Sequence, residues 1–267
     1  MWKPRSLFAS LFATAMLAAQ AVPAAMKPPP LRPGEALVIT LGDGGVQTYG
    51  EAKQEAPMGS LAQLVWMRLE GADWSSLGVR FKCTGAAGPF ICWKHDGHGK
   101  VDLGKALQEG CDLAFLLWIA SSQERWKADY GEAAARVRME DVFAPFLGRR
   151  LKAGEALPPL TAAWVGDGDL LRTSPEAFLR WLMEPEQSEV VNFGKRFLAG
   201  NWVEVKELFG KEDWWFKTGT AIVPGEPSAS CTWVVGGHGP VLAVLHLPRG
   251  RGRQEGLLRF KEVLGLK

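Results

Sequence analysis

The hydrophobic pattern of the chain predicts strands near both ends and helices in the middle. A short apolar run at Ala36–Thr40 is separated by a glycine-rich turn from a second candidate strand at Val46–Tyr49. The C-terminal third returns to strand-like runs bounded by glycine or proline, at 213–223, 231–236 and 241–247. An amphipathic pattern over 254–264 predicts a closing helix.

The central part of the chain follows helical periodicity instead. From Ser60 onward, apolar residues recur on one helix face, at Leu61, Leu64, Val65 and Leu69. Helical patterns continue over 103–150 and 175–209, with breaks at Pro145 and Pro158-Pro159. Strands, a large helical middle, more strands and a last helix predict an α+β fold. We expect an antiparallel sheet flanked by helices, with an inserted helical subdomain.

The first 25 residues have the layout of a secretory signal peptide. Lys3 and Arg5 precede the apolar stretch 7–19, which ends in small residues and is short for a membrane span. An uncleaved N-terminal anchor is the alternative. We assign 1–25 to the signal peptide, 26–34 to a linker and 35–267 to one domain. These assignments predict a periplasmic or secreted protein with no stable membrane span after cleavage.

The charge of the chain gives no reason to expect nucleic-acid binding. Cleavage would remove Lys3 and Arg5 and take the formal net charge from +2 to 0. A nucleic-acid-binding domain normally carries an excess of basic residues to pair with phosphates. We therefore expect no nucleic-acid partner.

The four cysteines leave three alternatives open. Cys83 and Cys92 flank a turn-rich stretch that could bring them together, and an exported chain would meet an oxidising compartment. A disulfide between these two is our prediction, with free thiols as the alternative. A zinc site with His95 and His98 is disfavoured, because the spacing of these residues matches no recognised zinc finger. We expect no metal and no cofactor.

Three short segments carry the candidate chemistry. The first is Pro57-Met58-Gly59-Ser60-Leu61-Ala62-Gln63, the second is Gly110-Cys111-Asp112 and the third is Lys217-Thr218-Gly219-Thr220. In this order the segments resemble the active-site motifs of penicillin-binding transpeptidases and class D β-lactamases. The pattern of those enzymes is Ser-x-x-Lys, Ser-x-Asn and Lys-Thr-Gly. In this chain Gln63 replaces the first lysine, Gly110 the second serine and Asp112 the asparagine.

Further landmarks extend the resemblance over nearly all of the predicted domain. The stretch from Cys83 to Leu107 is similar to the one that precedes Ser-Cys-Asn in class B transpeptidases. The segment 166–175 resembles their Gly-x-Gly-x-Leu-x-x-Thr-Pro pattern, with one extra residue before the proline, and 231–237 resembles the strand after Lys-Thr-Gly. We therefore expect a domain without the N-terminal module that is usual in class B transpeptidases.

The resemblance implies that Ser60 is the nucleophile if the protein is active. In the related enzymes the lysine three residues later is a leading candidate for the general base, and an amide such as Gln63 has no useful basicity. The glycine at 110 also removes a hydroxyl that would relay protons. The resemblance further implies that Lys217, Thr218, Gly219 and Thr220 bind the substrate, together with Gly110 and Asp112.

Three functions follow from these residues. The first is an exported domain that recognises a peptidoglycan stem peptide or a periplasmic protein, with acyl-transfer activity lost or much reduced. The second is an active serine transpeptidase or hydrolase in which another group, such as Lys217, has become the base. The third, a β-lactamase, is the least favoured, because class D enzymes also depend on the missing lysine.

Overall fold

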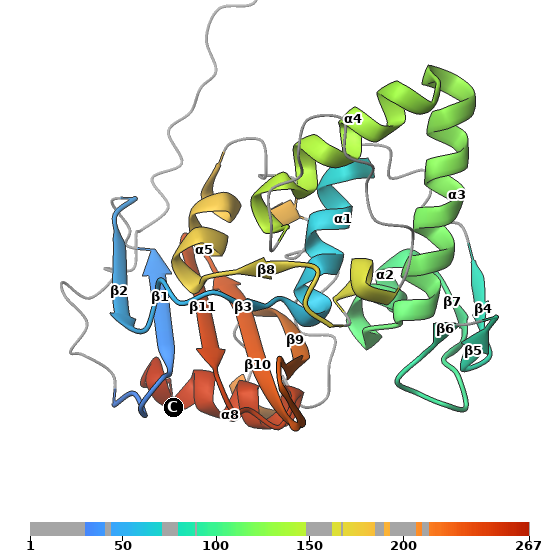
Figure 1. Ribbon diagram of the computed structural model, residues 1–267. Coiled ribbons are helices and arrows are strands. Elements are labelled where there is room, and N and C mark those ends of the chain that lie inside the picture. The colour runs from blue at the N-terminus through green and yellow to red at the C-terminus, as the bar shows by residue number, and fades with distance from the viewer. Residues whose placement is uncertain are drawn as a thin grey trace, which may run out of the picture.

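A five-stranded antiparallel sheet forms the centre of the molecule, in the order β2-β1-β11-β10-β9 (Figure 1). The computed structural model describes residues 30–40, 44–70, 80–88, 90–147, 162–166, 168–184, 190–192, 207–209 and 214–266. The strands of this sheet are β1 Ala36–Thr40, β2 Val46–Gly50, β9 Trp215–Val223, β10 Glu226–His238 and β11 Val241–Leu247. The five strands that the sequence predicts are confirmed, with β10 longer than expected.

Helices cover both faces of the sheet. The last helix, α8 (Arg253–Val263), packs on β10, where Gly256 lies against the side chains of Thr232 and Val234. Neighbouring Trp233 points to the opposite face, because successive side chains of a strand alternate. Its indole N–H donates to Pro57 O at 2.7 Å, just before helix α1 (Ala62–Glu70). The segment that carries the first motif is thereby attached to the sheet.

The inserted helical part is built from α2 (Leu103–Glu109), α3 (Asp112–Tyr130) and α4 (Glu132–Phe143). Helices α3 and α4 extend away from the sheet in Figure 1 and meet at Gly131. Buried rings of Trp66, Phe143 and Trp164 join α1 to α4 and to η4 (Ala162–Val165). The α+β fold with an inserted helical subdomain is therefore confirmed.

Short hairpins that the periodicity does not predict complete the fold. β4 (Phe81–Cys83) pairs with β7 (Gly99–Val101), and β5 (Ala86–Ala87) pairs with β6 (Phe90–Ile91). The other short elements are β3 Ala56–Pro57, which pairs with β8 Arg172–Thr173, and α5 Pro175–Met183, η1 Gly59–Leu61 and η3 Ala144–Phe146. Strands of two or three residues are too short to show an alternating pattern.

The predicted signal peptide and most of the predicted linker lie outside the described residues. Within the described part of the chain, no helix combines the length and the apolar character needed to cross a membrane.

A buried ion pair connects the last helix to the first strand. The Arg259 guanidinium donates to both carboxylate oxygens of Glu35, at 2.7 to 3.1 Å, and the two side chains are only 3% and 5% exposed. The Arg259 Nη1 atom also lies 2.6 Å from a carboxylate oxygen of Glu262. Removing one partner of such a pair leaves a buried charge without compensation.

We predict that Arg259→Leu lowers the free energy of unfolding by about 3 to 5 kcal/mol, because Glu35 would stay buried and charged. Urea denaturation of both proteins measures this loss. Arg249→Leu is the matched control, since Arg249 pairs with Glu226 at the surface and is 72% exposed. That change should cost at most about 1 kcal/mol. Equal losses in the two variants would contradict the prediction.

Candidate functional site

The first motif lies at the start of α1, against the edge of the sheet. Ser60 is part of the short helix η1, which leads directly into α1, and its side chain is partly exposed. Gln63 lies in the first turn of α1 and is fully buried. The sequence correctly predicts a helix here, although its first turn is a 3-10 turn.

Two glycines let the first motif touch the third. Gly59 has a φ of 54°, and a Cβ at this position would lie 2.6 Å from the backbone of Thr220. In the same way, a Cβ on Gly219 would lie 2.7 Å from Met58 O. Any larger residue would force the helix away from β9. The Lys-Thr-Gly glycine is therefore needed for close backbone approach.

The second motif is the junction between α2 and α3. Gly110 ends α2 with a φ of 64°, a left-handed conformation that glycine adopts without strain. Its carbonyl accepts a hydrogen bond from the indole N–H of Trp93 at 2.9 Å. The missing serine hydroxyl therefore coincides with a helix cap that favours glycine.

A hydrogen bond joins the first motif to the second. The Gln63 amide donates from Nε2 to Asp112 Oδ1 at 2.8 Å. A lysine at position 63 would lie beside this carboxylate and would be held as an ammonium ion. Gln63 and Asp112 are thus compatible with each other, because the neutral amide donates a hydrogen bond to the carboxylate.

The Lys217 side chain is only 2% exposed, and its Nζ donates to Thr218 O at 2.9 Å. Burial lowers the pKa of Lys217 to about 8, and Arg253 lowers it slightly further, while Asp112 opposes both by stabilising the ammonium. The amine can therefore change its charge at a mildly alkaline pH.

The three motifs surround one cleft, which divides into two cavities beside Ser60. The larger has a volume of about 510 Å³, and the predicted residues that line it are Ser60, Gly110, Asp112, Lys217, Thr218 and Thr220. The smaller, of about 290 Å³, lies between Ser60, Asp112 and the exposed side chains of Trp93 and Ile222. Gln63 and Gly219 line neither cavity: Gln63 is buried and Gly219 is held against Met58 O.

The sequence interpretation missed three side chains of the cleft. Arg251 and Arg253 line the larger cavity at the start of α8, and Trp93 lines both cavities. The Arg-Gly-Arg run directly after a strand was a usable signal for a cationic wall. Trp93 gave no signal, because its position depends on the β5–β6 hairpin.

The predicted disulfide between Cys83 and Cys92 is not formed. All four cysteines are free and buried, and Cys83 and Cys92 each face His98 Nδ1, at 3.6 and 3.5 Å, instead of each other. Cys111 of the second motif lies in the same group. The turn-rich stretch between Cys83 and Cys92 does fold back on itself, through the pairing of β5 with β6.

The chain has the fold of penicillin-binding transpeptidase domains and class D β-lactamases. One match is PBP2 from Helicobacter pylori, solved in complex with MreC. The alignment covers 86% of this chain and 59% of that chain, with TM-score 0.62 and 12% identity. The class D β-lactamase FUS-1 from Fusobacterium nucleatum matches with TM-score 0.55 and 12% identity over 86% of this chain and 89% of that one.

A third match is to the C-terminal domain of the BlaR penicillin receptor from Bacillus licheniformis. It has TM-score 0.55 and 14% identity over 87% of this chain and 89% of that domain. No family model matches the sequence, and no curated protein matches it. At such low identity these likenesses show the fold alone.

We predict that the stability of the protein increases with pH between about 8 and 10.5, relative to Lys217→Met. The folded chain binds a proton at Lys217 with a pKa of about 8, against the ordinary value of 10.5. Between these values the unfolded chain holds more protons, so raising the pH favours folding. Urea denaturation of both proteins across this range measures the difference. Curves that stay parallel would contradict the lowered pKa.

Proposed function

We propose that this chain is an exported domain that binds an extended peptide with a free carboxylate, such as a peptidoglycan stem peptide. Its acyl-transfer activity is lost or much reduced. The supporting observation is that the groups expected to recognise a peptide line one cleft, while the position expected to hold the general base carries an amide. Ser60 faces the cleft with Lys217, Thr218 and Thr220, whereas Gln63 is buried against Asp112.

The edge strand supports peptide binding by strand addition. β9 is the last strand of the sheet in the described part of the chain, and its Thr218 and Thr220 line the cleft. A peptide strand can add to such an edge through backbone hydrogen bonds. Lys217, Arg251 and Arg253 surround the same cavity and provide cations for a carboxylate. Neither interaction needs proton transfer.

Backbone donors could also receive a carbonyl group of the ligand. Gly59 holds the Ser60 segment against the backbone of Thr220, and both residues line the cleft. By analogy with the enzymes that the sequence resembles, the donors would be the backbone N–H groups of Ser60 and Thr220. In acyl-transfer enzymes, paired backbone N–H groups stabilise the developing oxyanion. A periplasmic protein segment that presents a terminal carboxylate would meet the same groups, and it is the alternative ligand.

One observation favours a second candidate function, an active serine acyltransferase with a relocated base. The pKa of Lys217 is lowered to about 8 by burial, and Lys217 lines the same cavity as Ser60. A neutral amine in that position could accept the Ser60 proton. Penicillin acylation separates the two functions.

We expect no penicillin adduct on the wild-type protein, because Gln63 cannot accept the Ser60 proton. The variant Gln63→Lys with Asp112→Asn should acylate about 10² to 10⁴ times faster, since it restores the base and removes the carboxylate that would keep it charged. Intact mass spectrometry after incubation with a labelled penicillin measures the adduct. The same variant carrying Ser60→Ala is the control. Rapid labelling of wild-type Ser60 would instead support the relocated base.

We expect the wild type to bind a synthetic stem pentapeptide more tightly than the same peptide with an amidated C-terminus. Lys217→Ala should weaken binding of the free acid about tenfold or more, because it removes a charge-assisted hydrogen bond. Lys53→Ala, at an exposed site away from the cleft, should not change it. Titration calorimetry gives all of these affinities. Equal affinity of the acid and the amide would exclude carboxylate recognition.

A further inference from the structure

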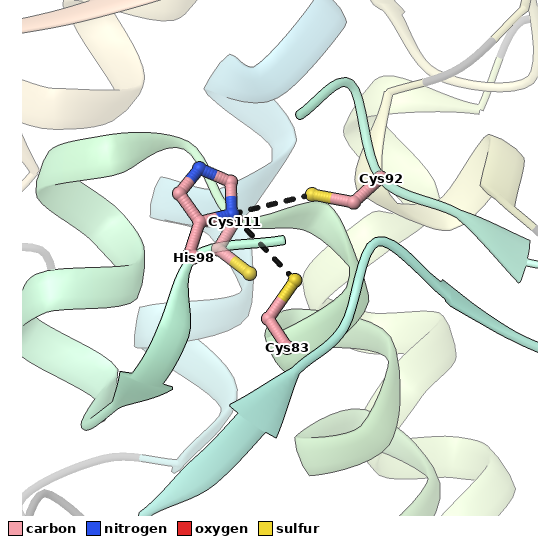
Figure 2. A group of neighbouring side chains, drawn as sticks. All are labelled: Cys83, Cys92, His98 and Cys111. Atoms are coloured by element: carbon pink, nitrogen blue, oxygen red, sulfur yellow. Dashed lines mark hydrogen bonds between the residues drawn. The ribbon is translucent and has the colours of Figure 1, made fainter. Parts of the chain in front are cut away.

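Four metal-binding side chains gather behind the second motif. They are Cys83, Cys92, His98 and Cys111, all buried, and their ligand atoms lie within 4.8 Å of one another (Figure 2). Figure 2 shows the three sulfur atoms and the imidazole pointing toward a common centre. Buried cysteines often behave as small apolar residues. Here, however, His98 Nδ1 lies between two sulfur atoms, at 3.5 and 3.6 Å, which apolar packing does not explain.

The backbone is shaped to bring these side chains together. Cys83 ends β4, Cys92 follows β6, His98 precedes β7 and Cys111 caps the start of α3. Cys92 N donates to Gly85 O at 2.8 Å, which closes the loop between the first two ligands.

Two glycines make the necessary turns possible. Gly85 has a φ of 91° and Gly97 a φ of 77°. A Cβ on Gly85 would lie 1.7 Å from His95 O, and one on Gly97 would lie 2.2 Å from Cys83 O. Only glycine fits at these two positions, one beside Cys83 and one beside His98. These two glycines therefore allow two tight turns, and together the turns bring the four side chains close to one another.

Two of the ligand–ligand distances match those around a tetrahedral zinc ion, and none of the others exceeds 4.8 Å. Zinc binds sulfur at about 2.3 Å and imidazole nitrogen at about 2.0 to 2.1 Å. At tetrahedral angles, these bond lengths place a sulfur and a nitrogen about 3.6 Å apart, and two sulfurs about 3.8 Å apart. The two sulfur–nitrogen distances in the structure, 3.6 and 3.5 Å, agree with this geometry.

We propose that Cys83, Cys92, His98 and Cys111 bind one Zn²⁺ ion in a closed, structural site. Three thiolates and one imidazole form a complete tetrahedral set of the type that structural zinc sites use. Binding replaces the thiol protons, which pass to the solvent, and the charges of the three thiolates offset that of the ion. No ligand position is left for substrate, so the metal has no part in acyl transfer.

The zinc site also fixes the wall of the cleft. Cys111 stands between Gly110 and Asp112, which both line the larger cavity. Trp93, next to Cys92, packs edge-on against the His98 ring at 5.3 Å and donates to Gly110 O. Metal binding at Cys92 and Cys111 therefore holds both Trp93 and the second motif in position. The zinc proposal does not depend on whether the cleft binds a peptide.

Metal analysis of the full-length protein tests the proposal directly. After dialysis against metal-free buffer, inductively coupled plasma mass spectrometry should find one zinc ion per chain. Cys111→Ser and Cys83→Ser should each lose most of this zinc. Cys231→Ser is the matched control, because Cys231 is also free and buried but faces Pro57 O, outside the cluster. The Cys231→Ser variant should keep one equivalent of zinc.

A second test uses only the wild-type protein, so its result does not depend on whether the cysteine variants fold. In this test Co²⁺ takes the place of zinc. Co²⁺ in this site should give strong visible ligand-field bands and a near-ultraviolet thiolate charge-transfer band. Zinc should abolish both. Removing the metal with a chelator should speed hydrogen exchange at residues 110–113 and leave β10 unchanged.

Two results would overturn the proposal. One is a wild-type protein that holds far less than one equivalent of zinc and gives no tetrahedral cobalt spectrum. The other is a Cys83–Cys92 disulfide in non-reducing peptide maps of freshly purified protein, because it would consume two of the four ligands. Iron in place of zinc would confirm the ligand set and correct the identity of the metal.

Discussion

The close contact between the start of α1 and the edge strand β9 is the constraint on which the cleft depends. It joins Ser60 to the Lys217–Thr220 segment through glycines on both sides, where a single Cβ would overlap with backbone atoms. The Trp233 indole fastens the preceding Pro57 to the sheet. Because this contact is made by backbone atoms, it does not depend on the side chains at positions 60 and 63.

The side chains at the three motifs determine the chemistry that the cleft offers. The Gln63–Asp112 hydrogen bond pairs a neutral donor with a carboxylate. Gly110 caps the end of α2 in a left-handed conformation and carries no hydroxyl. Cationic groups remain around the cavity, with Lys217 buried and Arg251 and Arg253 at the start of α8. Binding an anion needs these charges, whereas acyl transfer also needs a proton acceptor.

The second motif joins the cleft to the proposed metal site. Its outer residues, Gly110 and Asp112, line the cavity, while Cys111 between them points back into the cluster of sulfur atoms. In the proposed site, the middle residue of the second motif would therefore contribute to stability. Small β-hairpins contribute little hydrophobic core of their own, and a metal can supply the missing stability. The β4–β7 and β5–β6 hairpins fit that description, with strands of two or three residues.

The sequence alone determined the fold class and the parts of the cleft, because strand and helix periodicity and the order of three short motifs are local signals. It did not determine the hydrogen bond between Gln63 and Asp112, or the cationic wall at Arg251 and Arg253, since these depend on packing between distant segments. The sequence analysis expected no metal, and the grouping of the four ligands in the proposed site escaped it for the same reason. Cys111 lies far from Cys83 and Cys92 along the chain, and only the tertiary structure brings the three together.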